Sequence, residues 1–293
     1  MLLMLVGVAA QAAVTITASG GWFESAYVEF TPDGSSYYNV YYSTSASGSW
    51  TKIDDQLVRK YSSSKGRADV IGIAAGTYYI KVASVNSNGT ETSNTVSGAL
   101  TVKAHDRGGF AHFNWSKGVG AYTNTGVLKS GAIVKYICSA NAKTITMDVA
   151  SSSSKTTTYT GFQTILDALA KAYSKGWTTT PVAFRVLGTL KYSDMDAFSS
   201  SAEGIQVKGA SAYSDLPITI EGVGNDAVIH GFGFLIRNST DVELRNFAIM
   251  DCLDDCVSMD TSNSHIWVHN LDFFYGQAGS DSDQKKGDGT VDL

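Results

Sequence analysis

A short apolar segment recurs at a fixed spacing in the last third of the chain. Residues 218–222 read Ile-Thr-Ile-Glu-Gly, residues 242–246 read Val-Glu-Leu-Arg-Asn, and residues 266–270 read Ile-Trp-Val-His-Asn, so their start positions follow a constant period of 24. A second pair, residues 234–239 and 257–262, follows a period of 23. A period of this size indicates stacked supersecondary units. Because short strands recur without helices between them, the sequence predicts a right-handed parallel β-helix.

Asn246 and Asn270 fall at the same place in successive repeats, directly after a strand. Their side-chain amides are therefore predicted to stack and to bond the neighbouring repeats, as in an asparagine ladder. The alternative is two independent turn residues, because asparagine is favoured in turns anyway.

The repeat also predicts an acidic edge. Residues 251–293 contain nine aspartates and two lysines, a charge of −7, which leaves +2 for the rest of a chain whose net charge is −5. If Val257 lies beside Thr290, then Asp255 lies beside Asp288, and Asp292 shares the same strand parity. Carboxylates on neighbouring strands repel unless a cation lies between them, and oxygen-only ligands favour calcium or magnesium.

Two segments carry a family resemblance. Residues 255–274, which include the motif Ile-Trp-Val-His, and residues 288–292, Asp-Gly-Thr-Val-Asp, resemble the pectate lyases of polysaccharide lyase family one. The resemblance covers roughly residues 110–293 and implies that Asp255, Asp288 and Asp292 bind a catalytic Ca²⁺. Some members of the family use a further acidic ligand, whose position is occupied by Leu253 in this chain. Asp251 or Asp254 would take its place.

The resemblance also implies a reaction, the calcium-assisted β-elimination of pectate (polygalacturonate). In the family an arginine removes the proton, and its counterpart is expected after residue 293. The chain is thus interpreted as a C-terminally truncated, incomplete β-helix that lacks the catalytic base and is inactive as it stands. His269 departs from the family motif and is interpreted as structural.

Two other functions remain open. The adjacent Asp254 and Asp255 resemble the paired acids of polygalacturonases, which hydrolyse the same polymer on a β-helix with a general acid and a general base. The remaining polygalacturonase motifs are not found. Residues 238–241, Asn-Ser-Thr-Asp, are a poor match to one of them. The second alternative is a non-catalytic, polysaccharide-binding β-helix.

The N-terminal part has a different pattern. From residue 14 to about 102, apolar and polar residues alternate and are broken by turn signals, which is typical of a small β-sandwich. Residues 76–93 resemble the closing strands of a fibronectin type III domain, with Tyr78 at the position of its corner tyrosine. Trp22 and Trp50 are predicted to lie in the core, because large aromatic side chains are mostly buried; the alternative is an exposed ring that stacks on sugar.

One helix is predicted, between Thr160 and Gly176. Thr160 and Gln163 form a capping-box pattern, and Gly176 provides a C-terminal stop. Apolar residues follow helical spacing on one face. A single helix before many strands is expected to cap the N-terminal end of the stack.

The predicted organisation is a signal peptide at residues 1–12, a fibronectin type III-like β-sandwich at 13–102 and the β-helix at 103–293. The protein is therefore expected to be secreted. Cys138, Cys252 and Cys256 have no zinc-like spacing; Cys252 and Cys256 form either a small-loop bridge or buried thiols. The lysines and arginines form no basic stripe, so nucleic acid is not expected as a partner; neither is a membrane, and the protein is expected to be monomeric.

Overall fold

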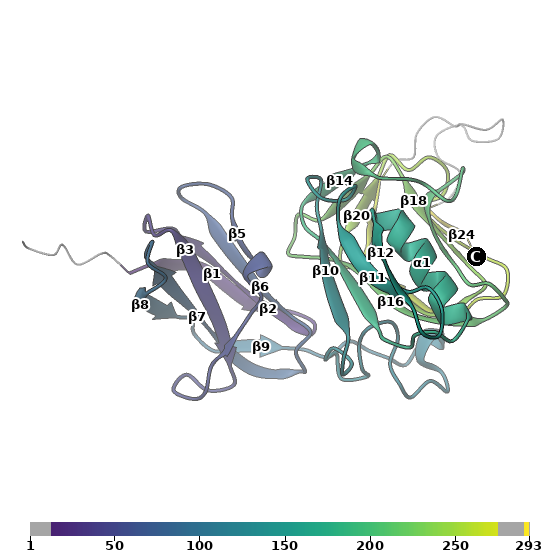
Figure 1. Cartoon of the computed structure of the whole chain (residues 1–293). Helices are drawn as coiled ribbons and strands as arrows, with labels where there is room; N and C mark the ends of the chain where they lie inside the picture. Colours follow the sequence, from purple (N-terminus) through teal and green to yellow (C-terminus); the bar gives the residue numbers. More distant parts are fainter. Residues whose placement is uncertain (1–12, 275–289, 293) are drawn as a thin grey trace, which may run out of the picture. The chain divides into compact units, whose positions relative to one another are not determined.

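The computed structural model describes residues 13–274 and 290–292. The chain divides into two compact units, Met1–His105 and Asp106–Leu293 (Figure 1). Strands dominate both units, so the all-β prediction is confirmed. The predicted signal peptide, residues 1–12, lies outside the described residues.

The N-terminal unit consists of antiparallel strands and a short 3-10 helix. Its elements are β1 (Thr15–Gly21), β2 (Ser25–Thr31), β3 (Tyr37–Ser43), β4 (Thr51–Lys52), η1 (Asp55–Leu57), β5 (Val58–Lys60), β6 (Gly66–Ile71), β7 (Gly76–Val85), β8 (Glu91–Val96) and β9 (Leu100–Val102). One sheet has the order β1-β2-β6-β5 and the other β4-β3-β7-β8, with β9 also paired to β7.

Apolar side chains lie between these two sheets. Phe30 of β2 is buried, and its ring centroid lies 4.9 Å from that of Tyr38 of β3. Val40 and Ile80 are fully buried on the second sheet. Tyr78 is buried, and its hydroxyl donates to the carbonyl of Ala74, 3.0 Å away and four residues upstream. Such a bond is typical of a corner tyrosine.

The two tryptophans of this unit differ from the prediction. Trp22 is 57% exposed, so its predicted core position is wrong. It lies in the connection between β1 and β2, where the alternation of a strand no longer directs side chains inward. Trp50 is half-buried.

The C-terminal unit is dominated by parallel strands. Its elements are η2 (Phe110–His112), β10 (Ile133–Ile137), β11 (Thr146–Ala150), β12 (Thr156–Thr160), α1 (Phe162–Ser174), β13 (Val182–Val186), β14 (Thr189–Lys191), η3 (Tyr192–Asp194), β15 (Gly204–Lys208), β16 (Ser214–Gly222), β17 (Val228–His230), β18 (Gly233–Arg237), β19 (Ser239–Arg245), β20 (Ala248–Met250), β21 (Val257–Asp260), β22 (Ser264–His269), β23 (Asp272–Phe273) and β24 (Val291–Asp292).

These strands form three parallel sheets, and β11 and β12 form an antiparallel hairpin. The orders are β10-β13-β16-β19-β22, β14-β17-β20-β23 and β15-β18-β21-β24. From β13 to β24 the described strands enter the three sheets in the same order in every repeat. Each repeat therefore adds one strand to each sheet.

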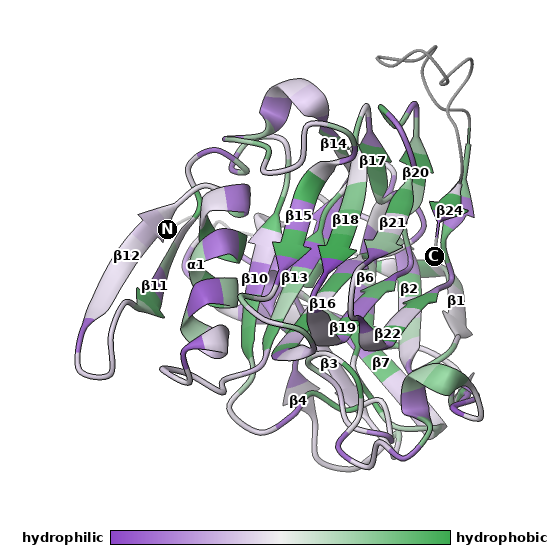
Figure 2. Cartoon of the chain, turned by 90° about the vertical axis from the view of Figure 1, so that its right-hand side faces the viewer, coloured by the Kyte–Doolittle hydropathy of each residue, from purple (hydrophilic) through white to green (hydrophobic). Residues whose placement is uncertain are grey.

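The register matches the periods read from the sequence. Ile218 pairs with Val242, and Val242 pairs with Ile266, so the first sheet keeps the period of 24. Phe234 pairs with Val257, which keeps the period of 23 in another sheet. Side chains of equal polarity are thereby placed above one another. The hydrophobic residues along β15, β18 and β21 can be followed in Figure 2.

Asn246 connects neighbouring repeats. Its backbone is left-handed, with φ 60°, and its Nδ2 donates to the carbonyl of Gly222, 2.6 Å away in the preceding repeat. A Cβ at Gly222 would lie 2.0 Å from the Asn246 carbonyl oxygen, so only glycine fits there. The Asn270 amide oxygen instead lies 2.8 Å from His269 Nδ1. The predicted contact between repeats is thus made by Asn246 with backbone, not between two amide side chains.

The helix α1 begins without the predicted capping box. Thr160 is still paired within the β11–β12 hairpin, and Gly161 with φ 97° is the N-cap. The carboxylate of Asp196 instead accepts hydrogen bonds from the amides of Gln163 and Thr164, at 3.0 and 3.1 Å. A residue distant in the sequence therefore satisfies the free amides of the first turn.

The C-terminal end of α1 follows the prediction. Gly176 has φ 66°, and the Trp177 amide donates to the Ala172 carbonyl, which gives the glycine-terminated end expected for a helix. The predicted apolar face is buried in the main core of the unit: Phe162, Ile165, Leu166, Leu169 and Tyr173.

Gln163 links α1 to the first strand of one sheet. Its Oε1 accepts from the Gln206 amide at 2.9 Å, and its Nε2 donates to the Gln206 carbonyl at 3.0 Å. Gln163 is fully buried. Its side-chain amide therefore takes the place of a neighbouring strand on the edge of β15, where backbone groups would otherwise lack partners.

Candidate functional site

The connection between β20 and β21 is acidic. We call residues 251–256, Asp-Cys-Leu-Asp-Asp-Cys, the acidic turn. Asp251 has a left-handed backbone, φ 51°, and its carboxylate lies 3.0 Å from His230 Nε2. Asp255 is 7% exposed. The turn therefore concentrates negative charge at the start of β21.

A glycine in the preceding repeat holds the backbone of the acidic turn. A Cβ at Gly233 would lie 2.4 Å from the Asp255 carbonyl oxygen and 2.5 Å from that of Cys256. The amide of Phe234 donates to the Cys256 carbonyl at 3.0 Å. Close approach of the two backbones thus requires glycine at the start of β18.

Asp292 lies on β24, the neighbour of β21, but in a different register from the one predicted. Val257 pairs with Val291, and Ser258 with Asp292, whereas the sequence analysis placed Val257 beside Thr290. The Val257 amide does bond the Thr290 carbonyl, at 3.2 Å, because parallel ladders use slanted hydrogen bonds. A one-residue change of register puts a side chain on the opposite face of the strand.

The described residues test only part of the predicted calcium site. The carboxylates of Asp255 and Asp292 are donors that calcium accepts, but the register separates their backbones by three residues along the strand, about 10 Å. Residues 13–274 and 290–292 contain no group of three His, Cys, Asp or Glu side chains placed to hold an ion. Asp288 lies outside the described residues. The three-aspartate site therefore stays a prediction.

A second concentration of charge lies on the outward face of β13, β16, β19 and β22. Both oxygens of Glu221 bond arginines: Arg185 Nε at 2.8 Å and Arg245 Nε at 2.8 Å. The Tyr122 hydroxyl also donates to Glu221. Arg245 lies 3.9 Å above the Tyr122 ring and bonds Glu243 at 3.3 Å. These charged side chains are all buried.

His269 completes this arrangement. Its Nε2 lies 3.1 Å from a carboxylate oxygen of Glu243, and its ring stacks on Trp267 with centroids 3.6 Å apart. The structural interpretation of His269 agrees with these contacts. We call Arg185, Glu221, Glu243, Arg245 and His269 the ionic network.

The pKa values of the ionic network follow from pairing. Burial by itself would raise the pKa of Glu243, but the charge of Arg245 and the bond from His269 outweigh it and lower that pKa to about 2. For Glu221, burial is likewise outweighed by Arg245 and Arg185, so its pKa is lowered. Burial raises the pKa of the Tyr122 hydroxyl. Both glutamates are therefore ionised at neutral pH.

At Asp241 the effect of burial on the pKa is larger than the effect of ion pairing. Its carboxylate accepts from the Gly120 amide at 2.7 Å and lies 3.3 Å from Lys129 Nζ. Burial raises the pKa of Asp241 to about 6 and lowers the pKa of Lys129 in spite of their mutual attraction. The cost of burying the two charged groups is therefore larger than the gain from their attraction. The Asp241 carboxylate connects residues 117–129 to β19 chiefly through hydrogen bonds such as the one from Gly120.

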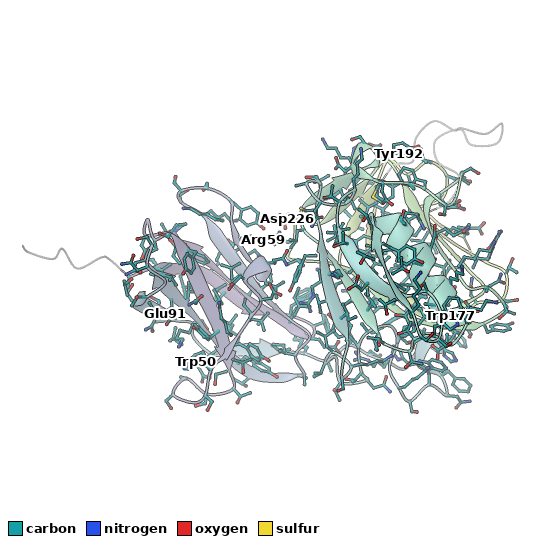
Figure 3. All side chains as sticks on the ribbon, in the orientation of Figure 1. Trp50, Arg59, Glu91, Trp177, Tyr192 and Asp226 are labelled. Atoms are coloured by element: carbon teal, nitrogen blue, oxygen red, sulfur yellow. The ribbon has the colours of Figure 1, made fainter. Side chains whose placement is uncertain are left out.

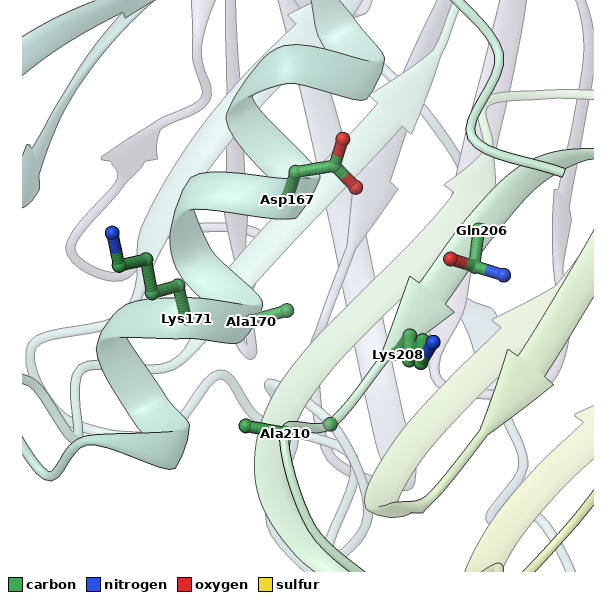
Figure 4. A pocket seen from close by; sticks show the side chains of 7 residues that line it. Asp167, Ala170, Lys171, Gln206, Lys208 and Ala210 are labelled. Atoms are coloured by element: carbon green, nitrogen blue, oxygen red, sulfur yellow. The ribbon is translucent and has the colours of Figure 1, made fainter.

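A small open pocket of about 230 Å³ lies between α1 and β15 (Figure 4). Asp167 points toward it from the helix, but its carboxylate is already bonded by Gln163 Nε2 and Ser199 Oγ, at 2.8 and 2.7 Å. The lysines at its rim, Lys171 and Lys208, are exposed. Because Asp167 is engaged in these hydrogen bonds, we place no reaction in this pocket.

The N-terminal unit carries a polar aromatic surface on the outer face of β3 and β7. Lys81 Nζ lies 4.3 Å from the Tyr41 ring centroid and 5.1 Å from that of Trp50. The Tyr41 hydroxyl donates to Glu91, and this bond raises the pKa of Tyr41 to about 12. Trp50 and Glu91 are labelled in Figure 3. These side chains therefore contact one another on the surface of the unit.

The ionic network was not predicted from the sequence. Its signal was present, because Glu221, Arg245 and His269 occupy the same position in three successive repeats, one residue before the strand ends or at its end. A charged residue recurring at one position of a stacked repeat indicates a ladder of ion pairs. The partner Tyr122, 99 residues before Glu221, had no signal in the sequence.

Comparisons with known proteins give limited likenesses. No family model and no curated protein matches the chain. Among solved structures, a Fn3-like protein from Clostridium thermocellum is 25% identical with a TM-score of 0.25; the match covers 33% of this chain and 97% of that protein. A beta-1,2-glucanase from Parabacteroides distasonis is 17% identical with a TM-score of 0.26, and the match covers 33% of this chain and 14% of that enzyme. Likenesses at these TM-scores carry no argument about fold or activity.

In the described part of the chain, no helix has both the length and the apolar character needed to cross a membrane.

Proposed function

We propose that the C-terminal unit is part of a right-handed parallel β-helix of a secreted pectate lyase, and that it provides the cation-binding side of the site for polygalacturonate. The observation that carries this proposal is the position of Asp255 in the acidic turn, two residues before β21, the strand whose parallel neighbour β24 carries Asp292. Acidic residues in and beside successive strands of one sheet suit a divalent cation and an anionic polymer together.

The charge of the acidic turn determines what it can bind. Asp251, Asp254 and Asp255 repel a uronate polymer, so such a ligand binds there only with a cation between the two sets of carboxylates. Asp255 and Asp292, with Asp288 as the predicted third ligand, would hold a calcium ion. When bound, that ion would polarise the uronate carboxylate and make the neighbouring proton easier to remove.

Three arginines of the parallel strands, Arg185, Arg237 and Arg245, fit a structural role better than that of a catalytic base. Arg185 and Arg245 bond Glu221 inside the ionic network, and the pKa of each is raised. Arg237 is paired with Asp260, which raises its pKa. An arginine that acts as a base must lose its proton, so these three are not proposed as the catalytic base.

Calcium-dependent binding to polygalacturonate tests the proposal. The chain is passed over immobilised polygalacturonate in millimolar calcium and again in chelator, beside the variants Asp255→Asn and Asp272→Asn. Asp272 is exposed and lies on β23, in a different sheet, so it is a matched control for the loss of one carboxylate. We expect retention only with calcium, loss in Asp255→Asn, and no change in Asp272→Asn.

Because the catalytic arginine is expected after residue 293, the products are measured on a longer chain that includes it, and they then separate the remaining functions. A lyase releases unsaturated uronides with a strong ultraviolet absorbance, whereas a hydrolase of the polygalacturonase type releases saturated reducing ends. Binding without either product identifies a polysaccharide-binding β-helix. Retention that is equal in calcium and chelator, or saturated products alone, would contradict the lyase proposal.

A further inference from the structure

Cys252 and Cys256 lie at the two ends of the acidic turn. Their Sγ atoms are 2.7 Å apart, and each residue is 1% exposed. A disulfide bond is about 2.0 Å long, whereas non-bonded heavy atoms prefer about 3.5–4.0 Å. The two sulfurs are therefore closer than a packing contact requires.

We propose that Cys252 and Cys256 form an intrachain disulfide that closes the acidic turn. The proposal rests on how the backbone holds the two residues. Cys256 is fixed by the hydrogen bond from Phe234 and by the close approach of Gly233, and Cys252 follows β20 directly after the left-handed Asp251. The bridge forms with a small movement of side chains because the turn has already brought the sulfurs together.

The surroundings of the two cysteines favour a bridge over a metal site. Both belong to the main apolar core of the C-terminal unit, with Phe247, Ile249 and Val257 in the same cluster. Thiolate ligands would place charge in this apolar environment, whereas a disulfide is neutral and has no polar hydrogen to satisfy. In residues 13–274 and 290–292 these cysteines belong to no group of three potential metal ligands.

The bond requires an oxidant, and a low-molecular-weight disulfide such as oxidised glutathione supplies it. One cysteine thiolate attacks a sulfur of glutathione disulfide, which forms a mixed disulfide and releases one glutathione thiolate. The second cysteine thiolate then attacks the protein sulfur of the mixed disulfide and releases the second glutathione. Two protein thiols lose two electrons and two protons, and one glutathione disulfide becomes two glutathione thiols.

The bridge is independent of the proposed function. It encloses Leu253, Asp254 and Asp255 in a loop of five residues, so it restricts the backbone of the acidic turn whatever that turn binds. Because both sulfurs are buried, exchange takes place while the turn is open or before the chain has folded, and the closed bridge is then protected from reductants.

Alkylation and peptide mapping test the proposal on the full chain. The folded protein is equilibrated with a mixture of reduced and oxidised glutathione, acid-quenched, denatured and treated with N-ethylmaleimide. We expect one adduct, at Cys138, and three adducts after prior reduction. A protease that cleaves before aspartate separates residues 251–253 from residues 255–259, so the bridge joins these two peptides until reductant is added.

Three comparisons make the result decisive. Cys252→Ser and Cys256→Ser must each give two adducts without reduction, since the remaining cysteine of the pair has lost its partner. In concentrated urea the ratio of bridged to reduced protein is expected to fall at least about tenfold, because folding brings the sulfurs together. Three adducts on the oxidised folded chain, a stable glutathione adduct on either cysteine, or a bridge to Cys138 would each overturn the proposal.

Discussion

The ionic network and the acidic turn belong to the same stacked repeats but differ in the charged side chains that surround their carboxylates. In the network, Glu221 and Glu243 are buried, and each carboxylate bonds at least one arginine, while His269 also contacts Glu243. The acidic turn has three aspartates and two cysteines in six residues and contains no lysine or arginine. The carboxylates of the network bond arginines of this chain, whereas for the acidic turn we propose a cation from outside. The contrast between a structural and a ligand-binding role can therefore be tested by substitution.

Removing one arginine from the ionic network should produce the largest effect. Arg245→Met leaves the buried carboxylates of Glu221 and Glu243 without their shared partner, and we expect a loss of about 3–5 kcal/mol in the free energy of unfolding. Urea denaturation followed by tryptophan fluorescence measures it. Lys208→Met is the control, since Lys208 is exposed, and a change within about 0.5 kcal/mol is expected there. Equal effects of the two substitutions would contradict a structural role for the network.

Acid should weaken the same network in a defined pH range. The folded-state pKa of Glu243 is lowered to about 2 from its ordinary value of 4.5. A depressed carboxyl pKa stabilises the folded state above the unfolded value, and this stabilisation, on the order of 3 kcal/mol, is lost as the pH falls from about 4.5 toward 2. The free energies of unfolding of wild type and Glu243→Gln should therefore converge below about pH 4.5. If the free energies of unfolding of the two proteins stayed a constant distance apart across this pH range, Glu243 would not titrate in this way.

The sequence predicted those parts of the fold that depend on its periodicity. The constant period placed Ile218, Val242 and Ile266 in one ladder, because the inward-facing side chains of every repeat must be apolar. The helical stop at Gly176 was also visible, since a glycine with a left-handed backbone has a local signal.

Other features depend on residues that are distant in the chain. The N-terminus of α1 is capped by Asp196, which follows the helix and the next two strands, while Thr160 is held in a hairpin. The register of Asp292 against β21 differs by one residue from the prediction, because the long connection before β24 breaks the period on which the prediction relied. Spacing alone fixes a register only while the repeat length is constant.

Oxidation should stabilise the acidic turn without touching the ionic network. Closing a five-residue loop between Cys252 and Cys256 restricts the unfolded chain and is expected to add up to about 2 kcal/mol to the free energy of unfolding. Denaturation of the oxidised and the reduced protein measures the difference. In Cys252→Ser the two redox conditions should give the same stability; a difference that persists there would assign the effect to something other than the bridge.

The smallest change is expected at Asp255, and it separates binding from stability. Asp255 is 7% exposed, but Asp255→Asn keeps the shape of the side chain and removes a charge next to Asp254, so we expect the free energy of unfolding to change by about 1 kcal/mol, well below the effect of Arg245→Met. The same substitution should abolish calcium-dependent retention on polygalacturonate. If it instead destabilised the fold as strongly as Arg245→Met, the carboxylate would belong to the scaffold, and the contrast between the ionic network and the acidic turn would fail. A small loss of stability together with a complete loss of binding is the combination that only a ligand-facing carboxylate gives.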